Sequence, residues 1–137
     1  MSETALYCRT AYNSAEAERS QVELLKWYAQ KNGFNSCAIY CEWNTSGVTL
    51  DRPFMQKLLS DVRTGEVKRI IVKDLSRFAR SFLIINELFR LLREYDVEVI
   101  SINDGGVIDI EWGNDLADAI RLFTQKEKTW RSKITVV

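Results

Sequence analysis

Short apolar runs alternate along the chain with longer stretches in which apolar residues recur every three or four positions. The short runs predict strands over residues 4–9, 36–42, 70–73 and 97–102. The longer stretches predict helices over residues 15–31, from 53 to about 63, and around 82–92. Pro53 stands where the second helix should begin, because its φ is already fixed, and the glycines at 33 and 65 mark two helix ends.

The alternation of strand and helix predicts a three-layer α/β domain around a mainly parallel sheet of four to five strands. A turn at 104–106 precedes residues 107–110, which are expected to add a short edge strand. Another helix is expected from 114 to about 132, so the chain divides into an α/β part over residues 1–112 and a C-terminal helix and tail over residues 113–137.

Trp112, Phe123 and Trp130 give the C-terminal helix region more apolar surface than a terminal helix needs when it packs alone. Residues 113–132 are therefore expected to be an element of self-association. Packing of the same side chains on their own domain is the alternative.

The bulk composition changes this picture little. The chain has 137 residues, enough for one domain with a real core, and its 19 basic and 19 acidic residues leave no net charge. A free-standing DNA-binding domain is usually basic. No apolar run approaches the roughly 18 residues of a membrane span, and the N-terminus lacks a basic region, so a cytoplasmic protein without membrane contact is expected.

Three cysteines, at positions 8, 37 and 41, lie in the apolar, strand-like runs. An odd number in such runs predicts buried, reduced thiols. Cys37 and Cys41 do not predict a metal site, because the sequence has no second pair and no histidine.

Arginines follow the predicted strands. Arg9 ends the first strand, and Arg77 and Arg80 lie in the run 73–80 (KDLSRFAR), between the third strand and the next helix. Arg52 lies in the loop just before Pro53. Ligands of open α/β sheets bind outside the carboxyl ends of the strands, and converging guanidiniums bind phosphate through paired hydrogen bonds. The sequence thus indicates phosphate chemistry without a histidine.

Four pieces occur in a telling order: Tyr7-Cys8-Arg9, then Gln21 early in the first helix, then the loop 46–53 (SGVTLDRP), then the run 74–80 (DLSRFAR). Together they resemble the catalytic domain of serine recombinases, the resolvase/invertase family, and most of all the large serine recombinases of phages and transposons. The resemblance covers about residues 4 to 127. Each piece alone is a weak signal.

The resemblance implies a function and a site. A serine would attack a phosphodiester of double-stranded DNA at a specific site, forming a 5′-phosphoserine link, and subunits of a tetramer would then exchange strands. Neither a metal nor another cofactor would be needed. Arg9, Arg52, Arg77 and Arg80 would surround the phosphate, and Gln21 would hydrogen-bond within the site. The alternative for Arg9 and Arg52 is pairing with Glu42, Asp51 or Asp74.

One position departs from the family pattern. The family motif after the first strand is Tyr-x-Arg-x-Ser, and Ala11 occupies the position of the nucleophilic serine. A methyl group cannot attack phosphorus, so this chain is predicted not to cleave DNA. Thr10 should point to the opposite face of the strand. Ser14 and Tyr12 lie in the loop beyond the strand, and Ser14 is also too close to Gln21 in sequence to match the family spacing.

Two explanations of Ala11 remain open: a serine that was changed to alanine to block cleavage, and a natural pseudo-recombinase that acts as a dimerisation or interaction module. Trp43 and Asn44 also replace loop residues that are often acidic and glycine in the family, and Ser76 replaces an aspartate that is frequent in small resolvases.

The family comparison also bears on the C-terminal part and on a rival fold. Glu127 and Lys128 look like the acidic-basic pair of the family's last long helix, after which a DNA-binding domain usually follows. Here that domain is expected to be absent, with weak and salt-sensitive DNA binding as the result. A receiver-like phosphate-binding domain is a poor alternative, since its strand ends should carry acids, whereas Arg9 and Lys73 are basic.

Overall fold

The computed structural model describes residues 3–110. Its elements, in order, are β1 (Thr4–Arg9), α1 (Ala15–Lys31), β2 (Ala38–Glu42), α2 (Pro53–Arg63), β3 (Arg69–Val72), the 3₁₀ turn η1 (Leu75–Arg77), α3 (Phe82–Glu94), β4 (Glu98–Ser101), the 3₁₀ turn η2 (Ile102–Asp104) and β5 (Gly106–Ile108). The expected helix over 114–132, with Phe123, Trp130, Glu127 and Lys128, lies outside the described residues, as does Trp112.

The strands form a five-stranded sheet in the order β2-β1-β3-β4-β5. β1 pairs in parallel with both β2 and β3, β3 pairs in parallel with β4, and β5 returns antiparallel to β4. Parallel neighbours need a crossover connection, which each helix supplies, whereas the tight turn at η2 suffices for the antiparallel β5. The predicted mainly parallel α/β sheet with a short edge strand is confirmed.

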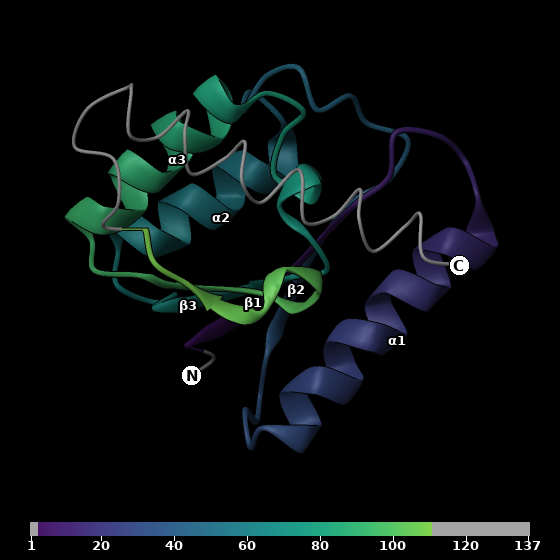
Figure 1. Cartoon of the computed structure of the whole chain (residues 1–137), viewed down its shortest axis with the longest axis horizontal. Helices are drawn as coiled ribbons and strands as arrows, with labels where there is room; N and C mark the ends of the chain where they lie inside the picture. Colours follow the sequence, from purple (N-terminus) through teal and green to yellow (C-terminus); the bar gives the residue numbers. More distant parts are fainter. Residues whose placement is uncertain (1–2, 111–137) are drawn as a thin grey trace.

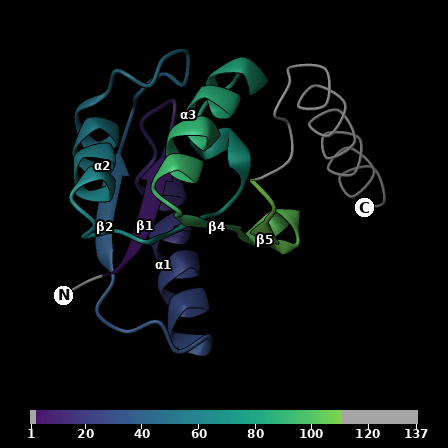
Figure 2. The same ribbon diagram turned by 90° about the vertical axis from the view of Figure 1, so that its left-hand side faces the viewer.

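Three layers are visible in Figure 1 and, from the side, in Figure 2: α1 covers one face of the sheet, and α2 and α3 cover the other. Side chains alternate along β1 between these layers. Tyr7 belongs to the larger core under α2 and α3, with Leu58 and Phe89, while Leu6 and Cys8 belong to the smaller core under α1. All six residues of β1 are buried, as expected for a central strand covered on both faces.

Several expected strand boundaries shift by one or two residues. β2 begins at Ala38 rather than at 36, because Ser36 has a φ of 58° and cannot continue a strand. β3 covers Arg69–Val72, β4 covers Glu98–Ser101 and β5 covers Gly106–Ile108, rather than 70–73, 97–102 and 107–110. The run 73–80 lies between β3 and α3, as expected. Asp74 caps the short turn η1 by accepting from the Ser76 N–H, and Ser81 separately caps α3 by accepting from the Leu83 N–H. Arg77 and Arg80 therefore lie on either side of a break in the backbone path.

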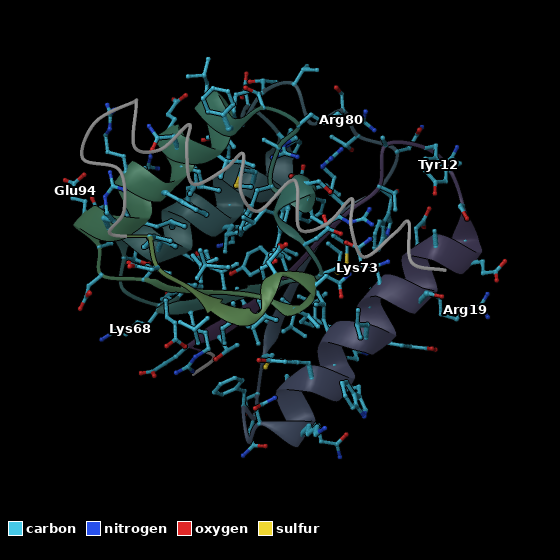
Figure 3. All side chains as sticks on the ribbon, in the orientation of Figure 1. Tyr12, Arg19, Lys68, Lys73, Arg80 and Glu94 are labelled. Carbon is cyan, nitrogen blue, oxygen red and sulfur yellow. The ribbon has the colours of Figure 1, made fainter. Side chains whose placement is uncertain are left out.

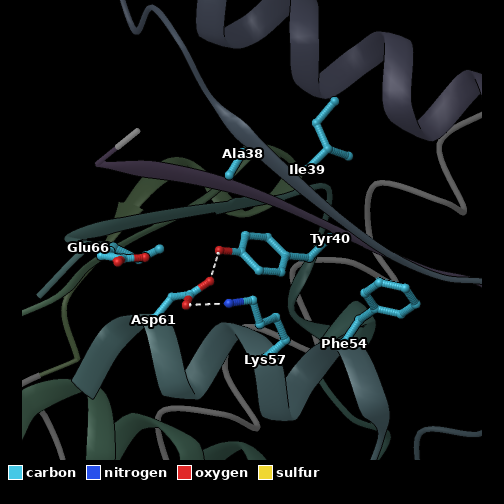
Figure 4. Close-up of a pocket in the computed structure, with 8 residues that line it drawn as sticks. Ala38, Ile39, Tyr40, Phe54, Lys57, Asp61 and Glu66 are labelled. Atoms are coloured by element: carbon cyan, nitrogen blue, oxygen red, sulfur yellow. Dashed lines mark hydrogen bonds and ion pairs between the residues drawn. The ribbon is translucent and has the colours of Figure 1, made fainter. Parts of the chain in front are cut away.

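A buried carboxylate ties α2 to the edge strand β2 (Figure 4). The Tyr40 hydroxyl donates to Asp61 at 2.6 Å, and Lys57 donates to the same carboxylate at 3.0 Å. Burial alone would raise the pKa of Asp61, but the hydrogen bonds from Tyr40 and Lys57 hold it below its ordinary value. The Asp61 brace thus fixes α2, and with it the helix start at which Arg52 lies.

Asp61→Asn is expected to lower the free energy of unfolding by about 1 kcal/mol at pH 7. A carboxylate with a depressed folded-state pKa contributes stability above its unfolded pKa, near 4, and loses it as the pH falls through the folded pKa. The difference between wild type and variant should therefore shrink below about pH 4. Urea denaturation at several pH values measures it, with the exposed Asp51→Asn as control. A difference that does not depend on pH would contradict the brace.

Candidate functional site

Arg9, Arg77 and Arg80 lie at or just beyond the carboxyl ends of β1 and β3, and Arg52 lies at the start of α2. Figure 3 labels Arg80, Tyr12, Lys73 and Arg19 on that side of the molecule, and Lys68 and Glu94 on the opposite side. β1 ends at Arg9, and β3 is followed within a few residues by Arg77. This is the carboxyl edge of the parallel strands, as the sequence predicted.

Arg9 is buried, and three backbone carbonyls take its donors. Its Nε donates to the carbonyl of Arg77 at 2.9 Å, its Nη1 to Thr45 at 2.8 Å and its Nη2 to Ser76 at 2.8 Å. The guanidinium therefore joins the β2–α2 loop to the segment after β3. A direct phosphate contact from Arg9 would have to use its two remaining N–H groups or exchange these bonds.

Gln21 of α1 holds the backbone of Arg9 rather than its side chain. The Arg9 N–H donates to Gln21 Oε1 at 3.0 Å, and Gln21 Nε2 donates to the Arg9 carbonyl at 3.2 Å. The side chain is buried, so both bonds are shielded from water. This paired contact anchors the first turns of α1 to the end of β1 and orients the arginine.

Arg52 lies at the N-cap of α2 and is only 3% exposed. Its Nη2 donates to the Phe78 carbonyl, and its guanidinium carbon is 5.9 Å from the centre of the Tyr7 ring. Neither Nε nor Nη1 has a hydrogen-bond partner among the described residues. A buried guanidinium with unused donors is costly unless an anion approaches it.

Glu42, which the sequence offered only as a pairing alternative, is the acid at the centre of this site. It is 3% exposed and ends β2. It accepts from the Tyr7 hydroxyl at 2.6 Å and from the Met55 N–H at 3.0 Å. Its Oε1 lies 3.8 Å from Arg52 Nε. The carboxylate therefore accepts from the first turn of α2, and a negative charge is favoured at this end of a helix. Burial, followed by the hydrogen bond to Glu42, raises the pKa of Tyr7.

Arg77 and Arg80 are the more accessible pair. Arg77 Nη1 donates to the Arg9 carbonyl at 3.2 Å, and its Nε lies 3.5 Å from Asp74 Oδ2 without a hydrogen bond. Arg80 is exposed, and its backbone N–H donates to the Gly47 carbonyl at 3.0 Å. The pairing alternative holds for Arg52, which lies 3.8 Å from Glu42, whereas Asp74 lies beside Arg77 rather than beside Arg9 or Arg52.

The four arginines act on one another electrostatically. Burial lowers the pKa of Arg9, and the neighbouring charges of Arg52, Arg80 and Arg77 lower it further, while Tyr7 opposes this. Arg9 therefore lies within reach of the positive charges of Arg52, Arg77 and Arg80. An arrangement of fixed cations and unused N–H donors is suited to a phosphate group.

Residues 4–133 match the sequence profile of the family described as "Resolvase, N terminal domain". The chain belongs to this family, the catalytic domain of serine site-specific recombinases. The predicted family is thereby confirmed. Comparison with curated protein sequences gives no significant match.

Solved structures of similar proteins show the same fold. The N-terminal catalytic domain of TP901-1 integrase is 22% identical, with a TM-score of 0.72 and coverage of 98% of both chains. A resolvase family site-specific recombinase from Streptococcus pneumoniae is 22% identical, with a TM-score of 0.65 over 97% of this chain and 90% of that one. The C-terminal catalytic domain of ISC1926 TnpA, an IS607-like serine recombinase, is 16% identical, with a TM-score of 0.66 over 96% of this chain and 84% of that one.

In this serine recombinase domain Ala11 is exposed and lies two residues beyond Arg9, in a bend after β1. The strand ends at Arg9, so the alternation of faces does not extend to position 10 or 11. Thr10 is unsuitable as a nucleophile for a different reason than the predicted one: it is buried, and its hydroxyl accepts from the Asn44 N–H at 3.2 Å. Ser14 is occupied as the N-cap of α1, accepting from Ala17.

Two cavities of the recombinase domain lie away from the arginines. A cavity of about 520 Å³ lies between β2 and α2, beside the Asp61 brace (Figure 4), and one of about 410 Å³ runs along α1 beside Trp43. Within residues 3–110 no group of His, Cys, Asp and Glu side chains could hold a metal ion, and no helix there is long and apolar enough to cross a membrane.

Gly47 brings the β2–α2 loop unusually close to Arg9. A Cβ at this position would lie 2.8 Å from Arg9 Nη2, 2.9 Å from Arg9 Cζ and 3.1 Å from Arg80 Cγ. A flexible side chain could usually yield to such a group. The Arg9 guanidinium cannot yield cheaply, because three hydrogen bonds hold it.

Gly47→Ala is therefore expected to lower the free energy of unfolding by about 1–3 kcal/mol, the usual cost of overpacking. Chemical denaturation measures the change. Ser46→Ala, at the exposed neighbouring position, should stay within about 0.5 kcal/mol of wild type. Equal stabilities for Gly47→Ala and Ser46→Ala would show that the loop does not pack closely against the Arg9 guanidinium in solution.

Proposed function

We propose that the arginine cluster of this domain binds a phosphodiester of double-stranded DNA at a recombination site, and that Ala11 leaves the chain as it stands unable to cleave it. The family as a whole serves site-specific recombination. What supports the finer proposal is one observation: four arginines meet at the strand ends beside Ala11, with donors of Arg52 and Arg77 unused among the described residues.

The roles divide by burial. Arg77 and Arg80 are accessible and would meet the non-bridging oxygens first. Arg52 would donate its unused Nε–H and Nη1–H to the phosphate from the interior of the domain. Arg9 would become the fourth guanidinium in contact with the phosphate if its bonds to carbonyls were exchanged. Gln21 is a positioning residue, because it touches the backbone of Arg9. Fixed cations aimed at the charge that develops on phosphorus oxygens lower the barrier without reorganisation.

A serine at position 11 would supply the missing step. Its hydroxyl oxygen would form a bond to phosphorus, its proton would leave to solvent or a base, and the 3′ oxygen of the neighbouring nucleotide would depart with the electron pair and take up a proton. The product is a 5′-phosphoserine link, and reversal with a new 3′-hydroxyl rejoins the strand. Strand exchange would then occur in a tetramer of such domains.

Restoring the serine tests this function. We would prepare Ala11→Ser, fuse it to a DNA-binding domain of known site and incubate it with supercoiled plasmid that carries this site, without divalent metal. Adducts that resist SDS and disappear with protease are expected from Ala11→Ser and not from the parent chain. A folded fusion that binds its site yet forms no adduct would refute the proposed cleavage chemistry.

Ala11 also supports a second candidate function, a non-catalytic recombinase that pairs with active subunits. In that case Ala11→Ser should remain inactive alone, while the parent chain should still enter oligomers. The two candidate functions therefore predict different results in the adduct assay and the same result in the oligomerisation assay.

Oligomerisation is proposed to depend on the C-terminal segment 113–137, and particularly on Phe123. Phe123→Asp is expected to shift the mass in solution to a smaller species, because a charge in an apolar interface remains unpaired. Sedimentation analysis or light scattering measures the shift, with Glu127→Gln as control. An unchanged mass would place the interface elsewhere.

A further inference from the structure

We propose that Cys8 and Cys41 form a reversible disulfide when the protein meets a hydroperoxide, which makes the pair a thiol modification site between β1 and β2. The sequence predicted three buried thiols, but only Cys8 is buried, and the free thiols of Cys37 and Cys41 are partly exposed. What the sequence did not show is that two of them face each other.

The strand register brings the two cysteines together. β1 and β2 are parallel, and their register pairs Cys8 with Cys41 directly. Paired residues of parallel strands point to the same face, and both side chains lie against the core under α1. Neighbouring strands are about 4.7–4.9 Å apart, which falls within the roughly 4.4–6.8 Å range of Cα separations found for disulfides. Cys37 has no such partner, since its thiol donates to the Phe34 carbonyl at 3.4 Å.

The two thiols differ in access. Cys8 is completely buried, with no exposed surface, whereas Cys41 is partly exposed at the edge strand. A dissolved oxidant can therefore reach only Cys41. Cys8 lies behind it as the thiol that resolves the oxidised form.

Hydrogen bonding between the thiols assigns their roles. The bond to Cys41, together with burial, raises the pKa of Cys8, so Cys8 keeps its proton. The hydrogen bond from Cys8 lowers the pKa of Cys41, and Lys26 helps, while burial and Glu18 oppose it. Cys41, which is also the thiol with exposed surface, is therefore the one that ionises first and reacts with electrophiles.

The reaction balances in two steps. The Cys41 thiolate attacks the terminal oxygen of the hydroperoxide, giving a sulfenic acid and, after protonation, an alcohol or water. The Cys8 sulfur then attacks the Cys41 sulfur, the S–S bond forms, and the hydroxide leaves as water with the proton of Cys8. A thiol reductant reverses the result. Arg9 and Glu42 directly follow the two cysteines in sequence, so the disulfide would lie one register pair away from the arginine cluster.

Peptide mapping tests the proposal on the whole chain. The folded protein is treated with hydrogen peroxide, free thiols are blocked, and the digest is analysed by mass spectrometry with and without reductant. A reducible peptide joining Cys8 to Cys41 is expected, in about tenfold excess over any linked peptide that contains Cys37. Cys37→Ser, the matched control, should leave this product unchanged.

The single variants separate the roles. Cys41→Ser should abolish the link and leave Cys8 unoxidised, and Cys8→Ala should leave a sulfenic acid at Cys41 that dimedone traps. The wild-type map decides the proposal even if the Cys8 variant does not fold. Absence of the Cys8–Cys41 peptide from oxidised wild type, or a dominant link to Cys37, would overturn it. Either result is independent of DNA cleavage and of the proposed function.

Discussion

Glu42→Gln is expected to lower the free energy of unfolding by about 3–5 kcal/mol, the cost of breaking a buried ion pair by removing one charge. Glutamine has the same shape and can still accept a hydrogen bond. It cannot balance the Arg52 guanidinium, which is 3% exposed and has a carboxylate oxygen 3.8 Å from its Nε. The N–H groups at the start of α2 would also lose the negative charge that they favour.

Urea denaturation of wild type and variant measures this loss. Glu87→Gln, on the exposed surface of α3, is the matched control and should change the stability by less than about 0.5 kcal/mol. The double variant Glu42→Gln, Arg52→Gln should recover part of the loss, because the unmatched buried cation disappears with its partner. If Glu42→Gln behaved like Glu87→Gln, Glu42 would not be the acid that organises the site.

Arg77→Ala in the Ala11→Ser background is expected to reduce the rate of DNA cleavage by at least about 10²-fold, the usual cost of removing one preorganised donor to a developing charge. Arg77 is only partly buried and makes a single 3.2 Å hydrogen bond to the Arg9 carbonyl. The fold should therefore survive the substitution, and the effect should appear in the chemical step.

Single-turnover formation of the covalent adduct measures this rate at saturating protein. Arg19→Ala is the matched control, since Arg19 is exposed on α1 and lies on the same side of the molecule without belonging to the cluster (Figure 3). Arg77→Lys should recover only part of the rate, because an ammonium cannot donate the paired bonds of a guanidinium. Cleavage by the Arg77→Ala variant at the rate of the Ala11→Ser protein would remove Arg77 from the phosphate site.

Much of the fold follows from short-range signals. Pro53, Asn32 and Gly33 bound their helices as predicted, because turn and cap preferences depend on the backbone of a few residues. The strands β1 and β3 are buried on both faces, and their unbroken apolar runs predicted this. The late start of β2 also has a local cause, since Ser36 has a positive φ.

The site was predictable in outline and not in its internal contacts. Arg9, Arg77 and Arg80 follow strands, and parallel strands end at a common edge, so their convergence could be expected. The sequence did not reveal that Arg9 donates hydrogen bonds to three backbone carbonyls. It also did not reveal that a Cβ at Gly47 would collide with the Arg9 guanidinium. Glu42 could have been suspected as an acid at the carboxyl end of a strand, where the arginines also gather.

The sequence by itself determined the family and the layers of the domain, and it places an alanine at position 11, since each depends on residue type, periodicity or order along the chain. Only the tertiary structure decided which cation meets which acid, and which thiol meets which. Arg52 with Glu42 and Cys8 with Cys41 are set by strand register and by crossovers between distant segments. Such pairings depend on the three-dimensional path of the backbone, and no pattern along a single chain carries that information.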